Sequence, residues 1–249
     1  MSLNLRIDFS ALGIKKNYLY EILATTFSFD KNLMVPNTAS MGVRLVNEKT
    51  LKIWPYPNTT TYKNIENSEV VVLNFVDDVY LYALASLKGS NLSKNNRAFS
   101  EEYYSYYTLN INGEYKDFAN SVTAGYPAQI PYLKQAWAII ICNATNILQI
   151  LKEDDFGEFK IMEIDLTVIS CEKFGESFKL YNRTENLTLE TIVLATKLNV
   201  AIEKKDEALI RTINGKIEEN ISDIKRFGKN MSALKAIEHI EIYIKGLEV

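Results

Sequence analysis

The chain contains very little histidine and cysteine, with one His and two Cys in 249 residues. His239 lies far along the sequence from Cys142 and Cys171, so none of the usual spacings of a zinc site can be assembled. This shortage argues against a zinc enzyme and leaves no predicted metal ligand. His239 is expected to be a partly exposed helix residue. Both cysteines sit in apolar, strand-like runs, which predicts a reduced, buried pair, although sequence distance alone leaves a Cys–His nucleophilic pair open.

Long hydrophobic runs and an excess of positive charge are also missing. The longest apolar stretch, residues 136–142, is much shorter than the roughly 20 residues that a membrane helix needs. The N-terminal residues lack the apolar core of a secretion signal. With 28 basic and 31 acidic residues, the formal net charge of -3 gives no general attraction to nucleic acid. We therefore expect a cytoplasmic protein that binds neither membranes nor nucleic acid.

Strand-type patterns dominate the first two-thirds of the sequence. Apolar runs separated by turn signals form a meander, and two long strands with a two-residue period follow it. The expected strands are residues 18–29, 41–46, 51–54, 70–76, 134–151 and 158–172. In the last of them, Met162, Ile164, Leu166 and Val168 alternate with polar residues. This pattern predicts an antiparallel barrel with one covered face on each strand.

The hydrophobic period changes to helical spacing after Asn182. Apolar residues then recur three or four positions apart, with a helix break at residues 228–230 and Ser232 as a possible cap of the last helix. We expect a mainly β (α+β) chain that consists of a β-domain, residues 1–180, and a C-terminal helical subdomain, residues 181–249.

Two features of the middle of the chain have competing interpretations. Asp77 and Asp78 precede a helical pattern and are interpreted as helix caps rather than as a catalytic or metal-binding pair. Residues 103–107 form a tyrosine-rich run within the segment 88–129, which also holds a turn signal at residues 112–113. Because Tyr suits places that are apolar on one side and wet on the other, this run predicts a half-buried strand or a subunit contact, with a substrate lid as the alternative.

Small residues followed by hydroxyl residues make the strongest candidate site. A strand that ends with residues 38–43 contains Ala39, Ser40 and Gly42, and three threonines precede a short helical pattern that begins near Tyr62. Small residues let a flat ring lie against the backbone, and a helix start offers unpaired N–H groups to a phosphate. The pattern is typical of an FMN site. In the alternative, one Thr caps the helix, the others face solvent, and Gly42 only eases a strand bend.

The order of several motifs resembles the flavin reductase-like, FMN-binding split-barrel superfamily. The closest similarity is to a mainly archaeal family of unassigned function whose members carry a helical C-terminal part. The segments that carry the resemblance are residues 20–26, 39–43, 61–65 and 71–78, followed by a second signature at 181–183 and 189–198. The resemblance therefore spans about residues 18–198.

This resemblance implies an FMN-binding split β-barrel that forms a homodimer, with the C-terminal helices as a subdomain. The implied cofactor-binding residues are Thr38, Ala39, Ser40, Met41, Gly42, Thr59, Thr60, Thr61, Asn64 and Arg183. Arg183 either supplies a positive charge to the phosphate, for which Arg44 and Lys63 are alternatives, or caps a helix. No catalytic residue is implied, because backbone N–H groups facing the flavin stabilise the reduced ring.

The implied activity is that of an FMN-dependent oxidoreductase, with NAD(P)H as a possible electron donor. The sequence has no Gly-X-Gly-X-X-Gly fingerprint, but split-barrel reductases do not depend on one. The alternatives are a non-catalytic module that carries or senses FMN, and a structural dimer that has lost its cofactor. The sequence also leaves open a related flavin or a deazaflavin in place of FMN.

Overall fold

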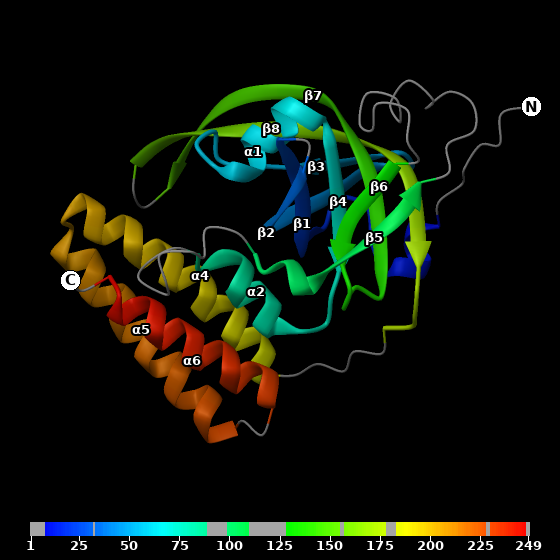
Figure 1. Cartoon of the computed structure of the whole chain (residues 1–249). Helices are drawn as coiled ribbons and strands as arrows, with labels where there is room; N and C mark the ends of the chain where they lie inside the picture. The colour runs from blue at the N-terminus through cyan, green and yellow to red at the C-terminus, as the bar shows by residue number, and fades with distance from the viewer. Residues whose placement is uncertain are drawn as a thin grey trace, which may run out of the picture. The chain divides into compact units, whose positions relative to one another are not determined.

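A computed structural model describes residues 8–31, 33–88, 99–109, 128–154, 157–177, 183–227 and 230–247. The chain forms two compact units, shown in Figure 1. The first contains Met1–Val76 and Ser100–Glu176, and the second contains Asp77–Phe99 and Ser177–Val249. The expected boundary lay at residues 180 and 181. The observed division differs because the chain leaves the first unit at Val76, adds a helix to the second unit and returns at Ser100.

The first unit is an antiparallel β-barrel, as the strand patterns predicted. Its strands close in the order β1, β2, β3, β8, β7 and β4, and β4 pairs with β1. Their bounds are β1 Leu19–Asp30, β2 Leu33–Asn47, β3 Thr50–Ile53, β4 Val70–Phe75, β7 Ala138–Asp154 and β8 Gly157–Lys173. A short 3-10 helix, Phe9–Leu12, precedes them, and helix α1, Thr60–Ser68, connects β3 to β4. This architecture confirms the expected α+β split barrel.

The barrel core consists of the inward side chains of alternate strand positions. On β8, Met162, Ile164, Leu166 and Val168 belong to this core, as their period predicted. Inward residues of the other strands, such as Val43, Leu73 and Ile140, are also buried. The neighbouring positions face outward, so each strand carries one core face and one outer face.

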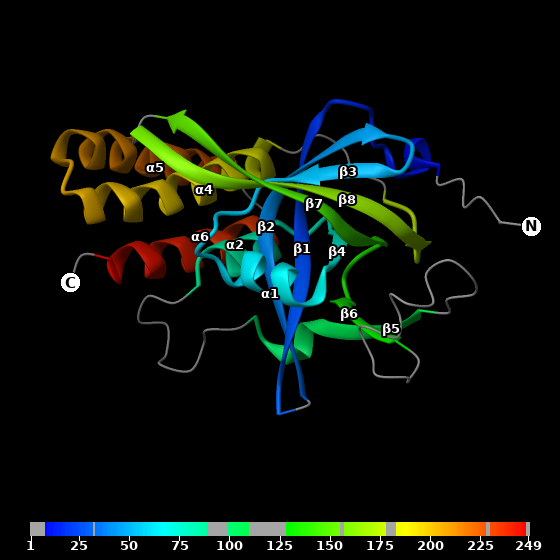
Figure 2. The same ribbon diagram turned by 90° about the horizontal axis from the view of Figure 1, so that it is seen from above.

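Strands β1 and β2 extend beyond the barrel as a long hairpin, which Figure 2 shows in blue. β4 pairs with β1 only over Leu23–Thr25, and β3 pairs with β2 only from Val43 onward. Within the described part of the chain, β2 residues 33–42 therefore have a strand partner on one edge only. The sequence placed a strand boundary near Met41, whereas β2 continues without interruption from Leu33.

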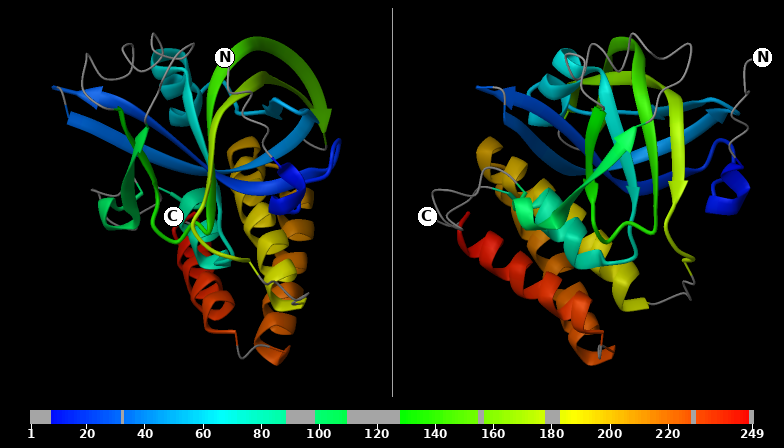
Figure 3. Two further views of the ribbon diagram at one scale, coloured as in Figure 1. Left: turned by 90° about the vertical axis from the view of Figure 1, so that its right-hand side faces the viewer. Right: turned by 45° about the vertical axis from the view of Figure 1, so that its right-hand side comes forward.

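The tyrosine-rich run forms β5, Tyr104–Leu109, which pairs with β6, Ala128–Leu133, in a separate two-stranded sheet. Figure 3 shows this ribbon beside the barrel strands. Tyr104 is buried, whereas Tyr106 is exposed, which confirms the half-buried strand. The turn expected at residues 112–113 lies outside the described residues.

The second unit is helical, with α2 Val79–Ser86, α4 Arg183–Lys204, α5 Glu207–Phe227 and α6 Met231–Lys245. Asp78 caps α2 by accepting a hydrogen bond from the Tyr80 N–H at 2.9 Å, which confirms the capping interpretation. The cap of α6 is Asn230, which accepts from the Ser232 and Ala233 N–H groups. The suggestion of Ser232 was wrong by two positions, because Ser232 already lies in the first turn and its hydroxyl bonds Asp78 instead. None of the described helices is long and apolar enough to span a bilayer.

His239 on α6 is expected to make the protein less stable in weak acid. Burial lowers its pKa from the ordinary 6.5, although a hydrogen bond to the Leu87 backbone partly opposes this shift, and its Nε2 is buried without a hydrogen-bond partner among the described residues. The unfolded chain therefore binds this proton more readily than the folded chain. Stability is fully present above pH 6.5 and falls as the pH drops towards the lower pKa of the folded state.

Melting temperatures measured between pH 8 and pH 5 check this effect by comparing the parent with His239→Gln. Carboxylates titrate alike in both proteins, so the difference between the two curves isolates the imidazole. Parallel curves would show that His239 does not contribute.

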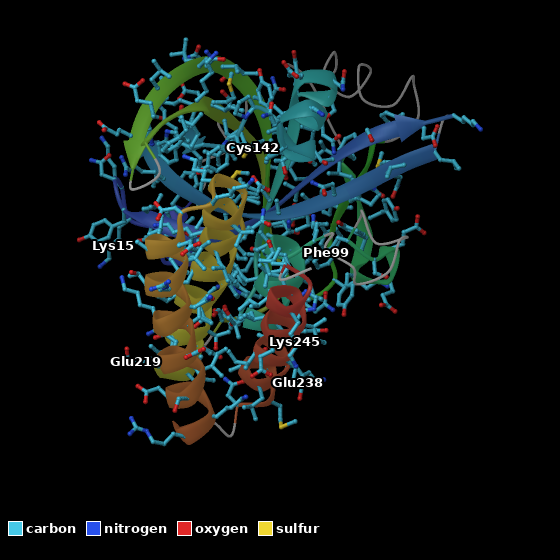
Figure 4. All side chains as sticks on the ribbon, turned by 90° about the vertical axis from the view of Figure 1, so that its left-hand side faces the viewer. Lys15, Phe99, Cys142, Glu219, Glu238 and Lys245 are labelled. Carbon is cyan, nitrogen blue, oxygen red and sulfur yellow. The ribbon has the colours of Figure 1, made fainter. Side chains whose placement is uncertain are left out.

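Both cysteines are free thiols on neighbouring strands of the barrel, and Figure 4 labels Cys142. Cys142 is fully buried, as predicted, whereas Cys171 is only half-buried because it lies near the end of β8. Burial raises the pKa of both thiols, that of Cys171 to about 11. At neutral pH neither thiol is ionised to a useful extent, which argues against a cysteine nucleophile.

Candidate functional site

The start of helix α1 is built by the three threonines. Thr59 is its N-cap, because the Thr59 hydroxyl accepts a hydrogen bond from the Tyr62 N–H at 3.3 Å. The same hydroxyl donates to the Tyr56 carbonyl at 2.7 Å. The capping alternative is therefore confirmed for Thr59, whose side chain is already engaged within the protein.

Thr61 and Asn64 face the barrel and attach the helix to the β1–β2 hairpin. The Asn37 side-chain amide donates to the Thr61 hydroxyl at 3.3 Å, and the Asn64 amide donates to the Thr26 hydroxyl at 3.2 Å. Thr61 and Asn64 are both buried. These contacts fix the first turn of α1 against β2, where the sequence placed the ring-binding residues.

Thr60 is the threonine that remains exposed at the helix start. The backbone N–H groups of Thr60 and Thr61 belong to the first turn, which has no acceptors within the helix. A partial positive charge accompanies these groups. Together with the Thr60 hydroxyl they make an anion-binding helix start, whereas Thr59 and Thr61 contribute mainly to holding it in place.

The β2 residues predicted to carry the ring differ in where their side chains point. Met41 is buried in the barrel core. Ser40 and Gly42 are half-buried and occupy the alternate, outward positions, and Ala39 is also half-buried. A Cβ placed on Gly42 would come closest to the flexible Leu19 side chain, with Cδ1 at 3.0 Å, and the Gly42 backbone is not left-handed. The fold itself therefore does not require glycine at position 42.

Thr38 is completely buried and takes part in a polar network beneath this stretch. Its hydroxyl shares hydrogen bonds with the Thr25 hydroxyl at 2.7 Å and with the Tyr104 hydroxyl at 2.8 Å. Burial raises the pKa of Tyr104 well above its usual range, so the phenol keeps its proton. The Thr38 backbone also hydrogen-bonds the Tyr104 phenol, so Thr38 holds β2 and β5 together.

Asn74 is the centre of this network. Its amide donates to the Leu23 carbonyl at 2.8 Å and to the Thr25 hydroxyl at 2.9 Å. Its Oδ1 accepts from the Leu133 N–H at 2.8 Å, which links the β5–β6 ribbon to the barrel. Sequence reasoning missed Asn74, Asn37 and Tyr104. Asn74 could have been found, because it is the single polar residue inside the otherwise apolar strand β4.

Arg183 is the first residue of α4, in the helical unit. Its participation in a phosphate site stays a prediction. The two alternative cations lie in the barrel unit. Lys63 is exposed on α1, and Arg44 stacks on Trp54, with its guanidinium carbon 5.2 Å from the ring centre.

The arrangement therefore offers two kinds of donor close together. The edge of β2 that faces away from β1 provides backbone groups for a planar heterocycle, and the start of α1 provides N–H groups and a hydroxyl for an anion. Asn37, which is bonded to α1, precedes Ser40 by three strand residues, or about 10 Å. This spacing fits a ligand with a flat ring at one end and a phosphate at the other.

Comparison with known proteins identifies the family of the chain and solved structures of similar fold. The model of a family described as a protein of unknown function (DUF447), N-terminal domain, matches residues 20–172. The crystal structure of an FMN-bound DUF447 protein from Methanosarcina mazei is 20% identical, covers 95% of this chain and 100% of that chain, and has a TM-score of 0.63. This likeness supports the fold described above. Comparison with curated proteins found no match.

Two further structures are more distant. The flavin reductase HpaC complexed with NADP+ is 13% identical over 66% of this chain and 84% of its own, with a TM-score of 0.42. Flavoredoxin from Methanosarcina acetivorans is 13% identical over 73% of this chain and 77% of its own, also with a TM-score of 0.42. At these TM-scores they carry no argument about the site.

Proposed function

Because the chain belongs to the DUF447 N-terminal domain family, as its motifs predicted, we propose that it binds FMN between the free edge of β2 and the start of α1. The observation that carries this proposal is the pair of donor sets joined by the Asn37–Thr61 hydrogen bond. The FMN-bound relative from Methanosarcina mazei supports the choice of ligand.

The residues of the chain fit this cofactor in distinct ways. Backbone groups of residues 39–42, on the edge of β2 that has no strand partner, would meet the polar edge of the ring, and a turn of the flexible Leu19 side chain would open the backbone at Gly42 to its face. The Thr60 hydroxyl and the N–H groups of Thr60 and Thr61 would hold the phosphate. Thr59, Thr61 and Asn64 keep the helix start in position, and Arg183 is a further candidate for charge pairing.

When bound, FMN supplies hydride or single-electron transfer, and we propose an FMN-dependent oxidoreductase that uses NAD(P)H or another small electron donor. The protein would orient the ring and stabilise its reduced form with fixed backbone donors, which needs no nucleophilic side chain. We propose that the protein acts in the cytoplasm as a homodimer. The exposed apolar residues Leu148 and Leu151 on the β7–β8 hairpin, 50% and 65% accessible, support a subunit contact, and a monomer mass in light scattering would contradict it.

The FMN site is tested by comparing FMN with riboflavin, which lacks the phosphate. Quenching of flavin fluorescence should show that riboflavin binds at least tenfold more weakly, because a hydrogen bond to a charged group contributes about 1.5–3 kcal/mol. Thr60→Val should weaken binding of FMN but not of riboflavin, and it leaves the helix cap intact. NAD(P)H oxidation by the FMN-loaded protein separates an oxidoreductase from a carrier or sensor.

Two results would contradict the assignment. A protein that cannot be reconstituted with FMN has no such site. Equal affinities for FMN and riboflavin would mean that the start of α1 does not hold the phosphate.

A further inference from the structure

Trp54 is fixed on the outer face of the barrel by an unusual set of charges. The Arg44 guanidinium carbon and the Lys152 ammonium nitrogen each lie 5.2 Å from the centre of its ring. The indole Nε1 donates to Glu163 Oε2 at 3.0 Å, which holds the ring by its edge. Two cations from strands β2 and β7 are thereby gathered at a single aromatic side chain.

The nearby carboxylate does not neutralise these two cations by direct pairing. Glu163 Oε1 accepts from Lys52 at 2.7 Å, and its other oxygen accepts from Trp54. These hydrogen bonds, together with the nearby charges of Lys52 and Lys152, lower the pKa of Glu163, so the carboxylate stays ionised and bonded to Lys52 and Trp54. In the described part of the chain, no carboxylate forms an ion pair with Arg44 or Lys152, and both are exposed.

The cluster lies beside the ring-binding stretch of β2. Val43 of β2 pairs with Ile53 of β3, and the two strands are antiparallel. Trp54, which follows Ile53, therefore lies level with Gly42, which precedes Val43. Arg44 points to the same face of β2 as Gly42, two residues or about 7 Å further along. A molecule that lies over Gly42 is therefore within reach of both cations.

We propose that Arg44, Lys152 and Trp54 form a binding site for a phosphate or carboxylate group of the second substrate, the molecule that reacts with the flavin. Arg44 supplies a planar set of donors, Lys152 supplies a compact positive charge, and the Trp54 ring holds the two cations in place. Naming the ligand as the flavin's second substrate rests on the proposed function, whereas the anion site itself does not.

Tryptophan fluorescence tests this site with inorganic phosphate and acetate as separate probes, which distinguish the two anion classes. In the parent protein we expect at least one probe to cause a saturable change in tryptophan fluorescence. This change should be lost in Trp54→Phe, which retains Trp137. Arg44→Gln and Lys152→Gln should each weaken the affinity about tenfold. Lys160→Gln, the same charge change at an exposed position on β8, is the matched control and should have no effect.

The titration is run on both the FMN-free and the FMN-loaded protein. Lys152→Gln should leave the affinity for FMN unchanged. If FMN fails to bind at all, the proposed function fails, while the anion titration still decides this site. The site is refuted if neither probe changes the fluorescence, if Lys160→Gln weakens binding as much as the two test variants, or if the change follows protein concentration, which would indicate a contact between copies.

Discussion

Replacing Asn74 by Ala is expected to lower the free energy of unfolding by about 3–5 kcal/mol, because it removes several buried hydrogen bonds at once. The Leu133 N–H loses its acceptor, and the Leu23 carbonyl and Thr25 hydroxyl lose a donor. The side chain is completely buried, so no water is available to replace it, and a small cavity adds to the cost. Urea unfolding at neutral pH measures the effect.

Asn67→Ala is the matched control for this prediction. Asn67 is an exposed residue of α1 with one hydrogen bond, from its amide to the Lys63 carbonyl at 2.8 Å. Its loss should cost less than about 1 kcal/mol. If Asn74→Ala were no more destabilising than Asn67→Ala, the network would not hold the β5–β6 ribbon to the barrel in the way described.

Replacing Gly42 by Val is expected to abolish flavin binding while leaving the fold intact. A branched side chain on the outer face of β2 would occupy the space that we assign to the ring, which should weaken FMN binding several hundredfold, or about 3–4 kcal/mol. Within the protein, the atoms nearest to the new Cβ belong to the flexible Leu19 side chain, which can turn away. Because Val suits a strand better than Gly, the melting temperature should stay the same or rise.

Flavin titration of the folded variant checks this result, with riboflavin as the second ligand. Both flavins should lose affinity alike, because the clash involves the ring that they share. A variant that binds FMN as tightly as the parent would place the ring elsewhere. A variant that loses only FMN would mean that the phosphate, rather than the ring, lies near Gly42.

Most strands of the barrel could be predicted from local sequence patterns, because each strand has one face in the core. The alternation in β8 is an example, since its inward residues are the apolar ones. The full length of β2 did not follow from such a pattern. Among the described residues, positions 33–42 of β2 have no strand partner along one edge, so their hydrophobic pattern reflects local neighbours rather than a closed sheet.

The sequence predicted the elements that the candidate site consists of, but not the role of each side chain in the structure. The hydroxyl cluster correctly marked the start of α1, yet sequence alone did not show that Thr59 caps the helix while Thr61 bonds Asn37. The role of Thr61 depends on Asn37, a partner more than twenty residues away in the sequence. The same reason explains why the Thr38–Tyr104 contact, which spans 66 residues, left no local signature.

Helix α2 belongs to the helical unit, whose other helices follow about 100 residues later in the chain. This order affects how the protein folds while it is being synthesised. Helix α2 is apolar around most of its surface, and Tyr80 on it contacts Ser232 and His239 of α6. A ribosome adding roughly 5–20 residues per second needs about 8–30 s to synthesise the 159 residues from the end of α2 at Ser86 to the end of α6 at Lys245. During that interval α2 has no α6 to pack against, so its apolar side chains lack part of their final cover.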